Sequence, residues 1–164
     1  RDIVFYRSRI DTACGLTSML NARYCPGDET IYLDETWIDG LLAVDDFTAI
    51  AILAHEWGHE VQDELGALDR SKERRYVRAL ELQADCFAGL FTRSQQDVGA
   101  VGGRALTDAR RFFASAGDPS SKTLSHGTGA QRVAWFNAGY GSGDLAVCES
   151  VFKKERALPR IPSQ

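Results

Sequence analysis

Two histidines and a glutamate in the stretch "LAHEWGHEVQ" have the types and spacing of a catalytic metal site. His55 and His59 are four positions apart, so on a helix both imidazoles can turn a ring nitrogen toward one ion. Glu56 lies beside that ion, where its carboxylate can accept a proton from an activated water. The pattern predicts zinc on the two histidines and Glu56 as general base. The alternative is a pair of buried, hydrogen-bonded and inert histidines.

A catalytic zinc ion needs a third protein ligand and an open fourth position. The chain has no metzincin-type extension, because Gln62 and Leu65 stand where that class has glycine and histidine. The stretch "ELQAD" supplies Glu81 and Asp85, again four residues apart and therefore on one helical face. The third ligand is therefore expected from this second helix.

Glu81 is the predicted ligand, and Asp85 is the predicted acceptor for the other ring N–H of a zinc-bound histidine. The surrounding "ALELQADCFAGLF" is otherwise apolar, which makes two carboxylates costly there unless they have a function. The alternative is an exposed acidic face without a site.

The third of the three histidines, His126, lies beside glycines in "SHGTGAQR". Hydrolysis of an amide places negative charge on the carbonyl oxygen, which needs a hydrogen-bond donor in addition to zinc. We predict that His126 is this donor, and that Arg132 holds the histidine loop or pairs with a carboxylate near the site. Two alternatives stay open for His126: a surface histidine, or the third ligand of a three-histidine site.

A long amphipathic helix is needed to carry the two histidines, and the sequence predicts one. It begins at Asp45 or Asp46, both good N-caps, and ends at Gly66. Apolar residues recur on one face at three- to four-residue spacing, and we expect this face to be buried. These residues are Phe47, Ile50, Ala54, Trp57, Val61 and Leu65.

Three further helices and two strands are predicted. The first of these helices starts near Ser71 and runs through residue 93, and the second covers 104–116. The third begins at Thr128, where Gln131 completes a capping-box spacing. The strands are "DIVFYR" and "TIYLD", both rich in β-branched and aromatic residues. "TIYLD" is a candidate edge strand whose Ile31, Tyr32 and Leu33 bind an extended peptide substrate through backbone hydrogen bonds.

These elements predict an α+β fold of the zincin-like kind, with a small N-terminal β-sheet, a mainly helical body and an active-site helix carrying HExxH. The 164 residues fit a single domain, 1–164, with 158–164 as a flexible tail. Because the chain begins at Arg1 rather than methionine, we expect a processed product or an excised piece of a longer protein.

Charge and hydropathy exclude two classes of partner. A formal net charge of −4 gives no basic field for nucleic acid or anionic lipid. The longest apolar run, 49–54, is far shorter than the roughly 20 residues that span a bilayer. We therefore expect neither nucleic-acid binding nor a membrane span within this chain, and nothing in the sequence predicts an oligomeric state.

The four cysteines contain no CxxC pair, which argues against a structural zinc ribbon. Their even number favours two disulfides, and the alternative is four buried free thiols in a cytosolic protein. Three pairings are possible. We predict Cys14–Cys25, which closes a short loop, and Cys86–Cys148, which ties the C-terminal segment to the middle of the domain.

Several motifs in order give a resemblance to a known family. They are "YCPGDETIYLD", "LAHEWGHEVQ", "LELQADCFAG", "SHGTGAQRVAWF" and "VCESVF". Together they span roughly 14–152 and resemble the bacterial neutral zinc metallopeptidases of the YpfJ type. "ELQAD" also resembles the third-ligand helix of gluzincins, thermolysin included. His126 followed by Arg132 resembles the His-Pro…Arg element of CAAX-processing peptidases, with Gly127 in place of the proline.

The resemblance implies one zinc ion per chain on His55, His59 and Glu81, with Glu56 as the catalytic base. It also implies an extracytoplasmic location, either secreted, periplasmic or anchored outside the membrane. One departure is Glu60, since relatives often have histidine at that position. This departure bears on substrate preference more than on the chemistry.

The predicted function is therefore a zinc-dependent endopeptidase acting on a peptide or protein substrate. One alternative is a zinc-stabilised secreted binding module without catalysis, although such a module has little reason to keep Glu56. The other is a zinc hydrolase acting on a non-peptide amide, which would need the same ligands.

Overall fold

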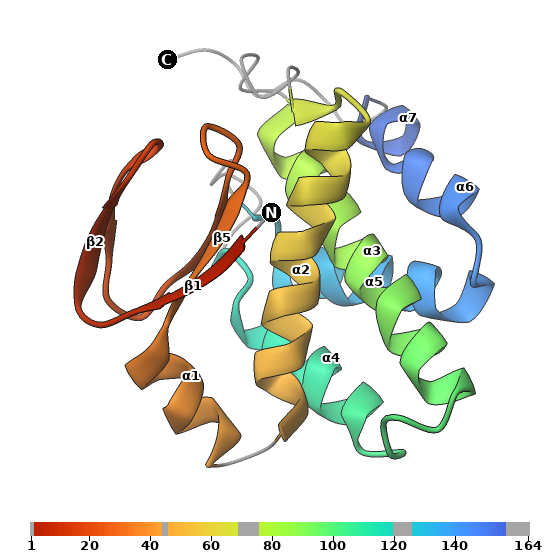
Figure 1. Cartoon of the computed structure of the whole chain (residues 1–164). Coiled ribbons are helices and arrows are strands. Elements are labelled where there is room, and N and C mark those ends of the chain that lie inside the picture. The colour runs from red at the N-terminus through yellow and green to blue at the C-terminus, as the bar shows by residue number, and fades with distance from the viewer. Residues whose placement is uncertain (1, 44–45, 69–75, 120–125, 157–164) are drawn as a thin grey trace.

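The computed structural model describes residues 2–43, 46–68, 76–119 and 126–156. It shows an α+β fold in which a small N-terminal sheet lies beside a body of helices (Figure 1). This confirms the fold class at that level. The predicted helix start near Ser71 and the predicted flexible tail, 158–164, lie outside the described residues. No helix in the described part is long and apolar enough to cross a membrane.

The main sheet has the strand order β1-β5-β4. β1 (Asp2–Tyr6) runs parallel to β5 (Thr30–Asp34), and β4 (Ala22–Cys25) runs antiparallel along the other side of β5. A separate hairpin consists of β2 (Arg9–Thr12) and β3 (Gly15–Ser18). The three strands of four residues, β2, β3 and β4, were not predicted, because such short segments carry little periodic signal.

The prediction that "TIYLD" is an edge strand is wrong. β5 is the central strand, it pairs with β1 and β4, and all five of its residues are buried. The backbone groups of Ile31, Tyr32 and Leu33 are therefore used within the sheet, and a substrate strand cannot pair with them. A near-continuous apolar strand of this kind is expected where both faces and both sides are covered.

Helices form the rest of the described chain. Each predicted helix is present, and Thr128 with Gln131 forms the predicted capping box. A helix directly after β5 was not predicted; Asp34 caps it by accepting hydrogen bonds from the backbone N–H groups of Thr36 and Trp37. The helices are α1 (Glu35–Leu42), α2 (Asp46–Glu64), α3 (Val77–Asp97), α4 (Ala105–Ser115), α5 (Gly129–Ser142), α6 (Leu145–Glu149) and α7 (Val151–Arg156).

The predicted apolar face of α2 is only partly buried. Trp57 and Leu65 are 48% and 57% exposed, so their assignment to the core is wrong. The reason is that α2 contacts β4, α1, α3 and α4, and polar residues occupy much of its buried surface. His55, Glu56 and Gln62 are among these buried polar residues. Apolar periodicity therefore located the helix and placed Phe47 and Ala54 in the core correctly, but it wrongly placed Trp57 and Leu65 there.

Both predicted disulfides are present. Cys14–Cys25 joins the turn of the β2–β3 hairpin to β4, and Cys86–Cys148 joins α3 to α6. Near the second bridge, α3 and α5 pack with little space between their backbones. A Cβ atom added at Gly139 of α5 would overlap the carbonyl oxygen of Cys86, so this crossing requires glycine.

We predict that Gly139→Ala destabilises the fold, although alanine is normally the better helix residue. Overlap with backbone atoms of α3 forces the two helices apart, at a cost of about 1–3 kcal/mol in the free energy of unfolding. Gly141→Ala is the matched control in the same helix, because nothing lies within 4 Å of its added Cβ. Urea denaturation should show a lower free energy of unfolding for Gly139→Ala and an undiminished one for Gly141→Ala. Equal stability of both variants would contradict the close packing.

Candidate metal centre

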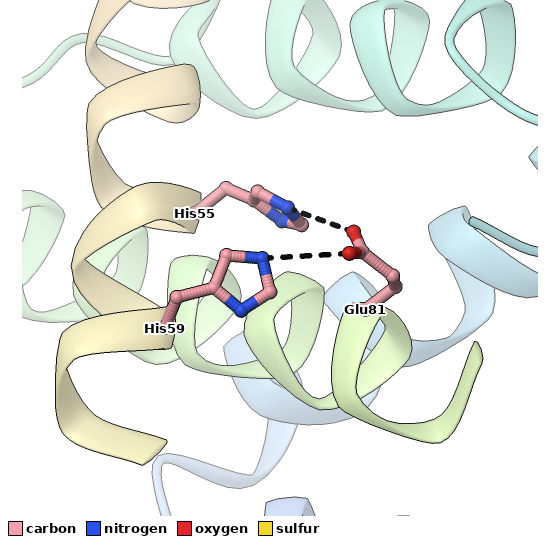
Figure 2. Close-up of side chains that lie close together, drawn as sticks. All are labelled: His55, His59 and Glu81. Carbon is pink, nitrogen blue, oxygen red and sulfur yellow. Dashed lines mark ion pairs between the residues drawn. The ribbon is translucent and has the colours of Figure 1, made fainter. Parts of the chain in front are cut away.

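The predicted metal ligands face one another between α2 and α3. His55 and His59 project from α2 toward Glu81 of α3 (Figure 2). His55 Nε2 lies 3.3 Å from Glu81 Oε2, and His59 Nε2 lies 3.7 Å from Glu81 Oε1. One ligand atom from each residue fits within 4.8 Å of the others. In the described part of the chain, no other group of histidine, cysteine and carboxylate residues meets this description.

A glycine inside the motif allows this approach. A Cβ atom added at Gly58 would lie 2.9 Å from Ala84 Cα, closer than such atoms come in proteins. Gly58 therefore lets the backbone of α2 lie against α3 at the level of the three ligands. Two imidazoles and one carboxylate are a known donor set for a catalytic zinc ion. The chemistry and spacing of these side chains thus fit zinc.

Asp85 supports His55 from behind. His55 Nδ1 lies 2.9 Å from Asp85 Oδ1, although the ring N–H is not aligned well enough for a good hydrogen bond. We regard the pair as a close electrostatic contact, which a small rotation of the imidazole ring would convert into a hydrogen bond. Asp85 is fully buried and receives two hydrogen bonds from Arg132, of 2.9 and 2.7 Å. Arg132 thus pairs with a carboxylate near the site, and the role of Asp85 as acceptor for the His55 ring N–H stays a prediction.

The electrostatics of the metal-free site are dominated by burial and by the facing charges. Burial alone lowers the pKa of His55, but Asp85 and Glu81 outweigh it and raise that pKa to about 10. The pKa of His59 is likewise lowered by burial and raised more strongly by Glu81. Burial raises the pKa of Glu81, yet the two histidines hold it well below its usual range. Without a metal, the site therefore favours imidazolium rings paired with an ionised carboxylate.

Glu56 lies where α2 meets the edge of the sheet. Its Oε2 accepts a 2.7 Å hydrogen bond from the backbone N–H of Tyr24 in β4. The side chain is buried, and its charge acts on His59 and Arg132. The contact fixes one carboxylate oxygen against β4. Sequence reasoning missed this contact, because a backbone N–H donor leaves no signature in the residue types.

His126 reaches the same site from the segment before α5. Its Nε2 lies 3.9 Å from Glu81 Oε2, and its side chain is 48% exposed. Asp118 holds this segment, because its Oδ2 accepts hydrogen bonds from the backbone N–H groups of His126 and Gly127. Asp118 was not predicted as a site residue. The position suits a donor at the rim of the site, and the catalytic role of His126 stays a prediction.

Gln62 is a further residue that the sequence reasoning missed. It is fully buried on α2, and its Oε1 lies 2.8 Å from His59 Nδ1. Its Nε2 donates to the carbonyl oxygen of Leu80 and to Oε1 of Gln83. The available signal was its place one turn after His59 on the same helix.

The structure thus brings together His55, Glu56, His59, Glu81, Asp85, His126 and Arg132. It leaves Ile31, Tyr32 and Leu33 inside the sheet, hydrogen-bonded to neighbouring strands.

Comparison with known proteins agrees with this geometry. Residues 1–151 match a protein family described as "Putative neutral zinc metallopeptidase". The chain is 36% identical to "Uncharacterized protein YpfJ" of Escherichia coli (strain K12), over 92% of this chain and 61% of that protein. It is 31% identical to "Uncharacterized protein Mb2605" of Mycobacterium bovis, over 88% of this chain and 60% of that protein. The chain thus spans about three fifths of the length of these relatives. No solved structure matches.

We predict that zinc binding releases protons. The raised pKa of His55, about 10, keeps its ring protonated at neutral pH, and the pKa of His59 is raised as well. A ring nitrogen must lose its proton before it binds a metal, so zinc affinity should increase from about pH 6 to about pH 8. Glu81, with its lowered pKa, is already ionised in this range and adds nothing to the slope. Calorimetry in buffers of different ionisation enthalpy counts the released protons. A pH-independent affinity without proton release would contradict the electrostatics described above.

Proposed function

This chain belongs to the neutral zinc metallopeptidase family, and on that premise we propose that it is a zinc-dependent endopeptidase with a zincin-like active site. The observation that carries the proposal is the arrangement around Glu81. Both histidines of the HExxH motif turn Nε2 toward its carboxylate, while Glu56, which lies between them in the sequence, accepts a hydrogen bond from the Tyr24 N–H at the edge of β4.

Zinc would be held by His55, His59 and Glu81. When bound, zinc supplies the Lewis acidity that polarises a peptide carbonyl and lets a water molecule lose a proton near neutral pH. Arg132 and Asp85 keep His55 in place, because the bidentate pair leaves Asp85 little freedom to turn away.

Glu56 is the proposed general base. Its Oε2 is engaged by the Tyr24 N–H, which leaves Oε1 to take a proton from water. The same carboxyl group then delivers that proton to the leaving amine of the cleaved peptide bond. The fixed oxygen restricts the carboxylate to one orientation and so lowers the entropy that it loses in the reaction.

The free side of β4 is the proposed place for an extended peptide, in place of β5. In the described residues, β4 pairs with β5 along one side only. The Tyr24 N–H points away from β5 toward Glu56, and Ala22, two residues earlier, presents its backbone to the same side. A peptide strand added there would pair with the backbone of Ala22 and with the carbonyl oxygen of Tyr24, next to the base, while the Tyr24 N–H stays bonded to Glu56.

His126 is the proposed donor to the carbonyl oxygen that becomes negative during the reaction. Its partly exposed ring lies within 4 Å of Glu81, at the open side of the ligand cluster. Asp118 fixes the two backbone N–H groups at this point of the chain and so limits the movement of the ring.

We also propose an extracytoplasmic location. The support is chemical: all four cysteines are paired in two disulfides, which persist in oxidising compartments and are rare in the cytosol.

Two variants test the proposed chemistry. Glu56→Gln should keep one zinc ion per chain and lose peptidase activity, because the amide still accepts from the Tyr24 N–H but cannot take a proton. Glu81→Ala should lose the metal, since the third ligand is removed. Zinc content by mass spectrometry and digestion of a peptide library measure the two effects.

The outcomes of that digestion separate the alternatives. Chelator-sensitive cleavage of peptides by the parent protein supports the endopeptidase. A zinc-loaded parent protein that cleaves only small non-peptide amides, or nothing, would contradict it in favour of an amide hydrolase or a binding module.

His126→Ala should lower kcat by about 10²–10³-fold, the usual effect of removing one such donor. KM and zinc content should stay unchanged, because the contact strengthens only as charge develops on the oxygen. His126→Gln keeps an N–H donor and should recover part of the rate. Unchanged kcat in His126→Ala would show that the residue is a surface histidine, and loss of zinc would make it a ligand.

A further inference from the structure

We propose that Gln62 is a positioning residue for His59, and that the carbonyl oxygen of Leu80 holds the Gln62 amide in its working orientation, with Gln83 as a second acceptor. The side-chain amide of Gln62 fixes His59 in the protonation form whose Nε2 is free to bind a metal. This inference rests on the zinc site proposed above. It concerns only the residue that orients one ligand, so the inference can be wrong even if the zinc site is correct.

The direction of the Gln62 amide follows from an unambiguous neighbour. One end of the amide lies 2.7 Å from the carbonyl oxygen of Leu80, which can only accept a hydrogen bond. That end must therefore be the NH₂ group, and the other end, toward His59, must be the oxygen. The assignment does not depend on any assumption about the histidine.

Gln83 is oriented in the same way. One end of its amide lies 3.3 Å from the carbonyl oxygen of Cys148, so this end is its NH₂ group. Its oxygen then faces Gln62 Nε2 at 3.1 Å and accepts the second N–H of Gln62. Both N–H bonds of the Gln62 amide are thus used, which leaves its oxygen as the group presented to His59.

The consequence for His59 is a defined tautomer. Gln62 Oε1 lies 2.8 Å from His59 Nδ1 and can only accept, so Nδ1 must carry a hydrogen. In the neutral ring, Nε2 then has the free lone pair, and Nε2 is the atom that faces Glu81. Without Gln62, the hydrogen can sit on either nitrogen, and the ring can rotate about its bond to the chain.

The two histidines are therefore held by different kinds of partner. A charged pair, Asp85 with Arg132, lies against the ring of His55. The ring of His59 contacts the neutral amide of Gln62, which in turn contacts the neutral amide of Gln83. Gln62 is fully buried and Gln83 is 3% exposed. An ionised carboxylate at the place of Gln62 would face the backbone carbonyl oxygen of Leu80 and the side-chain oxygen of Gln83, which are both acceptors. A neutral amide has the N–H donors that these two oxygens need and still presents an oxygen to His59.

A purely structural role is the competing explanation, because Gln62 also links α2 to α3 through Leu80. The two explanations differ in what else they affect. A structural link changes stability alone, whereas a positioning residue changes zinc affinity and the hydrogen on His59 Nδ1. Gln83 separates them, since its loss removes a buried link between α3 and α6 but leaves the contact between Gln62 and His59 in place.

The test uses Gln62→Met, which keeps the size of the side chain and removes its acceptor. Zinc affinity, measured by competition with a chelator, should fall about 10–100-fold, as for other groups that orient a metal-bound histidine. The ring N–H signal of His59 Nδ1 in the ¹⁵N-labelled, zinc-loaded protein should be lost through exchange with water, while that of His55 is kept. Gln83→Met is the matched control and should lower zinc affinity much less for a similar loss of stability.

Gln62→Glu keeps an acceptor toward His59, and burial beside two acceptor oxygens keeps its carboxyl group protonated, so that its O–H can donate to the Leu80 carbonyl oxygen. This variant should retain both the ring N–H signal and the zinc affinity of the parent, even if its stability is lower. This variant decides the question if Gln62→Met does not fold. Parental zinc affinity in Gln62→Met, or equal losses in Gln62→Met and Gln83→Met, would overturn the inference. So would loss of zinc in Gln62→Glu. A parent protein that binds no zinc would instead refute the proposed function.

Discussion

The site depends on one interaction, a carboxylate of α3 facing two imidazoles of α2. Glu81 meets His55 and His59 only because the two helix backbones lie close together at Gly58 and Ala84. A larger residue at Gly58 would separate the helices at the level of the ligands. The close approach has an electrostatic consequence as well, because three ionisable groups face one another where water is largely excluded. Those groups favour a protonated metal-free state and provide the donor atoms that a zinc ion requires.

The buried polar residues around the ligands serve the same constraint. Burial of uncompensated polar groups in the core would destabilise the fold, so each must find a partner. Asp85 is compensated by Arg132, and Gln62 by backbone carbonyl oxygens and Gln83. The Cys86–Cys148 bridge lies at the end of this network, because Cys86 follows Asp85 and the Cys148 carbonyl accepts from Gln83. Fold stability and ligand orientation are therefore carried by the same residues.

The candidate ligands could be identified from the sequence as one group because their geometry is local. His55 with His59, and Glu81 with Asp85, are pairs on single helices, where spacing alone determines the shared face. The strand order was not accessible in this way, so β5 was taken for an edge when β4 occupies it. Trp57 was assigned to the core because apolar periodicity cannot detect a helix face on which buried polar residues take the place of apolar ones. The contacts of Glu56 with the Tyr24 N–H and of Asp118 with two backbone N–H groups depend on tertiary packing and have no counterpart in residue spacing.

The most direct test of this account is a crystal structure of the zinc-loaded protein with anomalous diffraction recorded on both sides of the zinc absorption edge. The account predicts one zinc peak per chain, bonded to Nε2 of His55, Nε2 of His59 and the carboxylate of Glu81, with Glu56 nearby but not bonded. A peak at any other group of residues, or none at this position in a protein that retains zinc, would contradict it.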